Sequence, residues 1–164
     1  MLEYLKEQLE RSNYWLTFSE SKNAALVAFN VAIIAIIGEI ANSNMCLLGL
    51  SYLFIIVSIF ICLTSFVPNL SKESKQSESN KKNLKVNLIY YVEIAQLDAV
   101  SYIEGLKNKY HFHMIEWEQE VCRDYAEEII INSQIAVRKY KLFQYAVLAD
   151  LMCVILFFVN IILA

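Results

Sequence analysis

The sequence predicts an all-α membrane protein in which three transmembrane helices carry a mostly helical cytoplasmic segment between the second and third spans. Two observations predict this class. Of the 164 residues, 57% are apolar and only 19% are charged, below the quarter that is typical of soluble domains, and the apolar residues are gathered in long runs. The chain also has just 3 Gly and 1 Pro, which excludes collagen-like chains, glycine-serine linkers and turn-rich β architectures.

Three apolar runs are long enough to cross a bilayer, which takes about 20 residues of helix. We assign the first span to residues 20–41, with Lys22 reaching the membrane interface, the second to 45–67 and the third to 142–164. The second run has no charged residue, and the third has only Asp150. The alternative is three buried helices of a soluble domain. It is disfavoured because so small a domain cannot cover three such helices on all sides.

The distribution of cations predicts the orientation. All 14 Lys and Arg residues lie within 6–22, 72–123 and 138–141, and none lies in 39–44 or after Lys141. By the positive-inside rule, the N-terminus and the middle of the chain face the cytoplasm, and the first hairpin turn and the C-terminus face outside. The expected protein therefore crosses the membrane several times.

The cytoplasmic parts divide into three predicted segments. Residues 1–19 place leucines at helical spacing, and Tyr14 and Trp15 come just before the first span. This pattern predicts an interfacial lead-in helix rather than a partner-binding helix. Residues 68–85 are polar and without periodicity, which predicts a flexible linker. Residues 86–141 are expected to form a cytoplasmic helical segment. Its first six residues, VNLIYY, fit either a short strand or a helix start.

Within that segment, Gly105 is expected to break or cap a helix. No Gly or Pro follows His111, so nothing in the sequence interrupts a helix that runs into the third span. If it is unbroken from Phe112 to Ala164, it forms one rod of roughly 80 Å.

The sequence offers little for catalysis, and we expect no enzyme activity. His111 and His113 would point about 200° apart on a helix and so could not share a metal ion. The sequence contains none of the GxSxG, HExxH or P-loop motifs, so neither a metal nor another cofactor is expected. The net charge of -3 provides no basic surface for a nucleic acid polymer.

Polar residues inside the spans are the strongest candidates for function. Asp150 lies eight residues into the third span, about 12–13 Å from its cytoplasmic start, and Asn30 lies at nearly the same depth in the first. Ionisable groups at that depth face a helix bundle or water. Either Asn30 and Asp150 form one polar contact that joins two helices, or they line a water path in an oligomer. Glu39, at the outer edge, is expected to be solvated.

Three stretches carry a family resemblance: YWLTFSESKNAALVAFNVAII before and in the first span, LIYYVEIAQLDAVSYIEGL in the middle, and QIAVRKYKLFQYAVLADLMCVIL at the end. Together, and in this order, they resemble the Pycsar-type transmembrane effector family. The matching positions are Trp15, Glu20, Lys22, Tyr90, Tyr91, Ile94, Tyr102, Lys139 and Tyr140. The sequence departs from the family pattern at four positions. Alanine and aspartate are usual at Ser19 and Glu20, alanine is expected at Asn23, and glycine is usual at Val92.

The resemblance implies an antiphage defence effector that acts by abortive infection, impairing the inner membrane when a cyclic nucleotide is made. Either the middle segment binds this signal or a separate sensor protein does. The expected partners are the lipid bilayer and further copies of the chain, because three helices are too few to enclose a water path. Contacts between helices are expected at Asn30, Gly49, Ser51, Ser58 and Asp150. The alternative is a non-conducting membrane anchor or adaptor that recruits a cytoplasmic partner.

Overall fold

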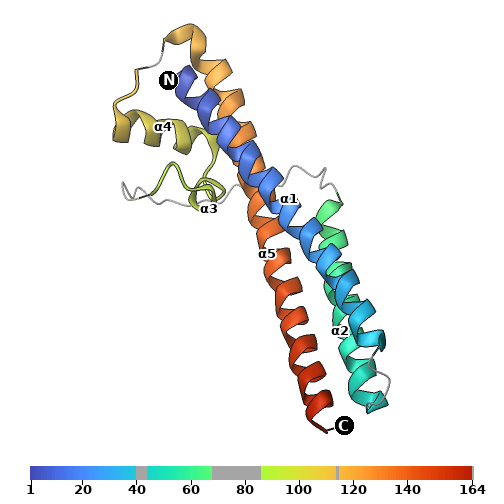
Figure 1. Cartoon of the computed structure of the whole chain (residues 1–164). Helices are drawn as coiled ribbons and strands as arrows, with labels where there is room; N and C mark the ends of the chain where they lie inside the picture. The colour runs from blue at the N-terminus through green and yellow to red at the C-terminus, as the bar shows by residue number, and fades with distance from the viewer. Residues whose placement is uncertain (40–43, 68–85, 114, 164) are drawn as a thin grey trace. The chain divides into compact units, whose positions relative to one another are not determined.

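The computed structural model describes residues 1–39, 44–67, 86–113 and 115–163 (Figure 1). Its elements in chain order are α1 (Leu2–Glu39), α2 (Met45–Phe66), α3 (Tyr91–Ile94), α4 (Ala99–Tyr110), a short 3₁₀ helix η1 (Glu116–Glu118) and α5 (Gln119–Leu163). These residues contain no strand. Three helices, α1, α2 and α5, are long and apolar enough to cross a membrane. The predicted all-α, three-span class is therefore confirmed.

The chain divides into two compact units. One comprises Met1–Phe18 and Asn69–Val137, and the other comprises Ser19–Pro68 and Arg138–Ala164. The apolar runs of the sequence all belong to the second, so we call it the membrane unit and the first the extramembrane unit. Helices α1 and α5 each contribute residues to both units.

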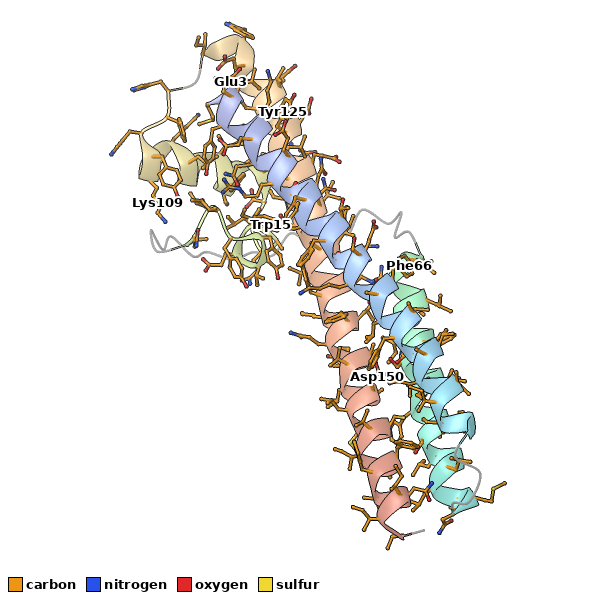
Figure 2. All side chains as sticks on the ribbon, viewed as in Figure 1. Glu3, Trp15, Phe66, Lys109, Tyr125 and Asp150 are labelled. Atoms are coloured by element: carbon orange, nitrogen blue, oxygen red, sulfur yellow. The ribbon has the colours of Figure 1, made fainter. Side chains whose placement is uncertain are left out.

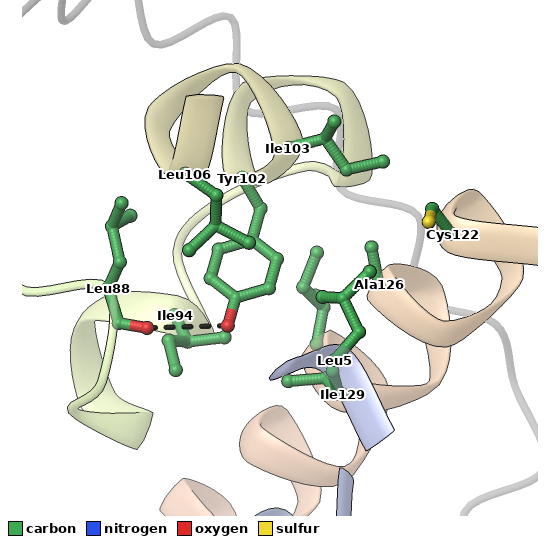
Figure 3. Close-up of a cluster of buried hydrophobic side chains, with 10 residues drawn as sticks. Leu5, Leu88, Ile94, Tyr102, Ile103, Leu106, Cys122, Ala126 and Ile129 are labelled. Carbon is green, nitrogen blue, oxygen red and sulfur yellow. Dashed lines mark hydrogen bonds between the residues drawn. The ribbon is translucent and has the colours of Figure 1, made fainter. Parts of the chain in front are cut away.

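The extramembrane unit has an ordinary apolar core built from α1, α3, α4 and α5 (Figure 3). Tyr102 lies at its centre, is fully buried, and its hydroxyl donates a hydrogen bond to the Leu88 carbonyl at 3.3 Å. This bond offsets the cost of burying the phenol, and burial raises the pKa of Tyr102 above its usual value. The other buried members are Leu5, Leu88, Ile94, Ile103, Leu106, Cys122, Ala126, Ile129 and Ile130.

Local signals position α4 against this core. Asp98 precedes the helix in extended backbone, and its carboxylate accepts a hydrogen bond from the Ser101 amide at 3.2 Å, which makes it the N-cap. The helix ends at His111, whose φ of 55° is the left-handed conformation common at helix C-termini. Between these caps, α4 buries Tyr102, Ile103 and Leu106.

The membrane unit is packed the opposite way. In α2 the buried residues are Ser51, Ile55, Ser58, Cys62 and Ser65. Their spacing of four and three residues is the heptad pattern of packed helices, and small side chains at such positions allow close approach in lipid. Large apolar side chains of the same helix, such as Leu53 and Phe60, are more than half exposed, as lipid-facing residues should be.

Three local expectations need correction, and the alternatives left open for residues 86–91 are decided. Residues 1–19 are not a separate interfacial helix, because α1 is continuous from Leu2 and buries Leu5 in the extramembrane core. Gly105 does not end a helix. A Cβ there would lie 3.1 Å from Leu88 Cδ1, so glycine gives this side chain room to pack against α4. Residues 86–91 form no strand; turns lead from them into α3 at Tyr91.

The third correction concerns the predicted rod. The helix begins at Gln119, after η1, rather than at Phe112, and from there it continues unbroken to Leu163. His111 and His113 lie between α4 and η1, outside any helix. The expectation that their side chains point in nearly opposite directions on a helix therefore does not apply. The predicted linker at 68–85 lies outside the described residues.

Candidate functional site

A line of buried polar side chains runs through the membrane unit, and we call it the polar seam. Each member is at most 8% exposed. Helix α1 contributes Ser19, Asn23 and Asn30. Helix α2 contributes Ser51, Ser58 and Ser65, and helix α5 contributes Lys139, Asp150 and Asn160. Polar side chains are costly in a membrane interior and persist there when they face other helices or water. The seam is therefore the candidate functional site.

Asp150 lies in the middle part of the seam (labelled in Figure 2). The side chains of Asn30 and Ser58 are its neighbours. Asn30 donates a hydrogen bond from its Nδ2 to the Ser58 Oγ at 2.9 Å, which joins α1 to α2. Both Asp150 carboxylate oxygens and the Asn30 Oδ1 have no hydrogen-bond partner among the described residues. A carboxylate at this depth costs about 2.5–3.5 kcal/mol on membrane-insertion scales, so the site is under-satisfied in this conformation.

This arrangement refines both sequence hypotheses for Asn30 and Asp150. The direct hydrogen bond that joins two helices is made by Asn30 and Ser58, and Asp150 stands next to it. The structure thus brings the two predicted residues together with a third. Gly49, expected at a helix contact, is exposed, and no described atom outside its own helix turn lies within 4 Å of the position a Cβ would take.

At the α1–α2 turn, the seam ends in a polar contact between α2 and α5. The Asn44 backbone amide donates to the Asn160 Oδ1 at 3.0 Å, and the Asn44 side chain accepts from the Cys46 amide at 3.1 Å as the N-cap of α2. The fully buried Asn160 thereby anchors the start of α2. The side chain of Glu39, the last residue of α1, lies outside the described residues.

At its other end, the seam closes on a buried lysine. The Lys139 Nζ donates to the Glu20 Oε1 and to the Ser65 carbonyl, each at 2.9 Å. Ser65 is in the last turn of α2, where carbonyl oxygens have no partner within the helix, so the ammonium group caps α2. One cation joins α1, α2 and α5. The Phe66 ring, with its centroid 5.8 Å from the Nζ, covers it.

Lys22 makes a second contact between α1 and α5 near this end. Its Nζ lies 5.3 Å from the centroid of the Tyr140 ring and 5.6 Å from that of Phe143. Both distances are within the range of a cation–π interaction. Four motif positions that are distant in the sequence thus form two pairs, Glu20 with Lys139 and Lys22 with Tyr140.

The other motif residues lie in the extramembrane unit. Trp15 packs against Tyr91 with ring centroids 5.1 Å apart, and Tyr91 packs edge-on against Tyr90 at 5.0 Å. Ile94 and Tyr102 are fully buried in the apolar core. These five positions stabilise α3 and α4 against α1 and α5.

Sequence reasoning missed the role of Lys139 as a buried helix cap, because a lysine at the end of a span is normally read as a solvated charge. It also missed Asn23, Ser65 and Asn160 as seam members. For Asn23 and Ser65, the sequence does contain a signal in the form of a seven-residue spacing. Ser51, Ser58 and Ser65 recur every seven residues, as do Asn23 and Asn30, which places each set on one helix face.

The fold and the seam define a multi-pass helical membrane protein whose membrane unit buries polar side chains and exposes large apolar ones. A family model described as the Pycsar effector protein domain matches residues 4–164. The chain therefore belongs to the Pycsar effector family, as its motifs suggested, and it is an antiphage defence membrane effector. Comparisons with curated proteins and with solved structures gave no significant match.

Proposed function

We propose that this effector assembles as a homo-oligomer in the inner membrane and permeabilises or disrupts it when a cyclic-nucleotide-type signal appears. One observation carries the proposal: the interior of the membrane unit contains a seam of nine polar side chains, and Asp150 in it has no hydrogen-bond partner among the described residues. Water in an opened seam would satisfy these groups.

Self-association is part of the proposal for a geometric reason. The three spanning helices of one chain bury the seam between them, so a single copy leaves no room for a water path. Several copies, each contributing its seam, can enclose one. Lipid-facing apolar side chains such as Phe29, Leu53 and Ile155 are more than half exposed and provide the outer surface of such an assembly.

The orientation we propose has the N-terminus and the extramembrane unit in the cytoplasm and the C-terminus outside. Lys22, Arg138, Lys139 and Lys141 belong to the end of the membrane unit where Lys139 caps α2. The opposite ends of the three helices carry no Lys or Arg. This asymmetry favours the cytoplasmic side for the basic end.

The signal itself reaches the effector either through the extramembrane unit or through a separate sensor protein. A hollow of about 580 Å³ in this unit is lined by Glu3, Glu7 and Glu10, with Lys6, Tyr4, Phe112 and Met1. Three carboxylates against one lysine disfavour a phosphate-bearing ligand there. This favours a partner protein as the receiver. We propose that the action of the effector on the membrane is not enzymatic.

The test is membrane depolarisation in cells that express the chain together with its signal. We expect a voltage-sensitive dye to report depolarisation for the wild type and a loss of at least tenfold in the response for Asp150→Leu, since leucine closes the seam. Leu151→Ala, at the same depth but facing lipid, is the matched control and should retain the response. Depolarisation that is equal in all three chains, at equal expression, would contradict the proposal.

A second candidate function is a non-conducting anchor or adaptor that recruits a cytoplasmic partner. It is favoured by three exposed apolar side chains at the start of α5 and just before it, Ile115, Trp117 and Val121. Intact membrane potential during a productive defence response, lost in Trp117→Ala, would support this function over permeabilisation.

A further inference from the structure

Asp150, Asn30 and Ser58 form a cluster of oxygen atoms that is buried and incompletely bonded. Asp150 is 6% exposed, and Asn30 and Ser58 are fully buried. Asn30 uses its amide nitrogen to donate to the Ser58 hydroxyl at 2.9 Å, which leaves its Oδ1 free. That atom and both Asp150 oxygens are without a hydrogen-bond partner among the described residues.

The charge of this cluster is not balanced by the protein. Asp150 is the only Asp, Glu, Lys or Arg between 142 and 164, and none occurs in 23–38 or 45–67. Lys139, the buried cation of the same unit, is already paired with Glu20. No Lys or Arg of the described segments forms an ion pair with Asp150. The cluster therefore presents one carboxyl group, which carries a negative charge when ionised, and up to four oxygen ligands.

We propose that Asp150, Asn30 and Ser58 bind a dehydrated monovalent alkali cation, Na⁺ or K⁺, inside the membrane unit. Carboxylate, amide and hydroxyl oxygens are the ligands that hard cations take. The single carboxylate selects a monovalent ion. One positive charge makes the site neutral, whereas a divalent ion would leave a net charge in a medium where charge is costly.

The neighbours of the site agree with a small ion rather than a larger ligand. Cys62 and Cys153 lie close enough to interact with the Asp150 charge, and both are buried. Neither thiol adds a positive charge to the cluster. Their sulfur atoms are poor ligands for alkali ions, so coordination depends on the three oxygen-bearing residues.

The inference deepens the proposed function, because a cation site within the seam is where an ion would pause on a conducting path. Binding does not depend on conduction, however, and the first experiment uses the purified full chain in detergent. Thermal unfolding is followed at constant ionic strength in NaCl, KCl or choline chloride. We expect a saturable rise of Tm in Na⁺ or K⁺ relative to choline, since a ligand that binds only the folded state stabilises it.

Two serines provide a matched pair of variants. Ser58 and Ser51 are both fully buried, seven residues apart on the same face of α2, but the Ser51 hydroxyl donates only to the Leu47 carbonyl of its own helix at 3.0 Å. Ser58→Ala should lower the apparent affinity for the cation at least tenfold, and Ser51→Ala should leave it unchanged. Asp150→Asn should abolish the alkali response.

The outcomes separate this inference from the proposed function. An alkali response that is lost in Asp150→Asn, in a chain that does not depolarise cells, supports the cation site and contradicts permeabilisation. Equal Tm values in Na⁺, K⁺ and choline overturn the cation site, whether or not cells depolarise. A Tm that depends on pH but not on alkali ions also overturns it, because the ligand would then be a proton.

Discussion

The extramembrane and membrane units use the same two helices differently. In the extramembrane unit the core around Tyr102 is mainly apolar, and α1 and α5 contribute Leu5, Ala126 and Ile129 to it. In the membrane unit they bury Asn23, Asn30, Asp150 and Asn160 beside a small apolar cluster, while many of their large apolar side chains are exposed. The difference follows from the solvent. Water drives apolar side chains inward, whereas lipid is itself apolar and leaves packing and polar contacts to associate the helices.

Buried residues therefore stabilise the two units through different interactions. An apolar core residue in the extramembrane unit contributes through the hydrophobic effect, and its truncation leaves a cavity. A buried polar residue in the membrane unit contributes through specific hydrogen bonds, which are worth less on average. The predictions below test this difference, from the largest expected effect to the smallest.

Tyr102→Ala should have the largest effect, lowering the free energy of unfolding of the extramembrane unit by about 3–5 kcal/mol, as for other large aromatic truncations. Urea unfolding can be followed by the fluorescence of Trp15 in a Trp117→Phe background. Tyr102→Phe removes only the 3.3 Å hydrogen bond to Leu88 and should cost about 1 kcal/mol. Equal losses for both variants would show that the core does not depend on the ring.

Lys139→Met should come next, with a loss of about 2 kcal/mol in the stability of the membrane unit. It removes two hydrogen bonds of a buried ammonium, each worth more than a neutral one, but Glu20 is half exposed and can hydrate when unpaired. Thermal unfolding in detergent measures the change. Arg138→Met, at an exposed neighbouring position, should change stability by less than about 0.5 kcal/mol and serves as the control.

Asp98→Ala should destabilise α4 by about 1 kcal/mol at neutral pH through loss of the N-cap. Burial alone would raise the pKa of Asp98, but hydrogen bonds from Ser101 outweigh it and hold the pKa below the usual value. The stabilisation is therefore complete above the ordinary Asp pKa of about 3.9 and is lost as the pH falls through the lower, folded value.

The measurement for this prediction is urea unfolding of the wild type and Asp98→Ala as a function of pH. The two chains should differ at pH 7 and converge in acid. Asp98→Asn, which retains a capping side chain without a titrating group, should lose the pH dependence. A difference that persists at the lowest pH would argue against the cap as its source.

Ser58→Ala should have the smallest effect when no alkali ion is present, about 0.6 kcal/mol, the average for a hydrogen bond between helices in a membrane protein. It leaves Asn30 without its acceptor but opens little space. Thermal unfolding in choline chloride is the measurement. A loss as large as that of Tyr102→Ala would mean that the seam stabilises its unit as strongly as an apolar core, and the contrast between the units would not hold.

The sequence by itself determined the all-α class, the three apolar helices and the family, because the length of an apolar run and short ordered motifs are local properties. It also singled out Asn30 and Asp150, since polar residues stand out in an apolar run. Only the tertiary structure decided what these residues contact. Glu20 and Lys139 are 119 residues apart in the chain, and the Ser65 carbonyl that completes the contact is backbone, which no sequence pattern distinguishes. The continuity of α1 likewise accompanies the long-range packing of Leu5 in the extramembrane core. Only the structure shows that α4 ends at the left-handed His111 and that α5 begins at Gln119, after η1.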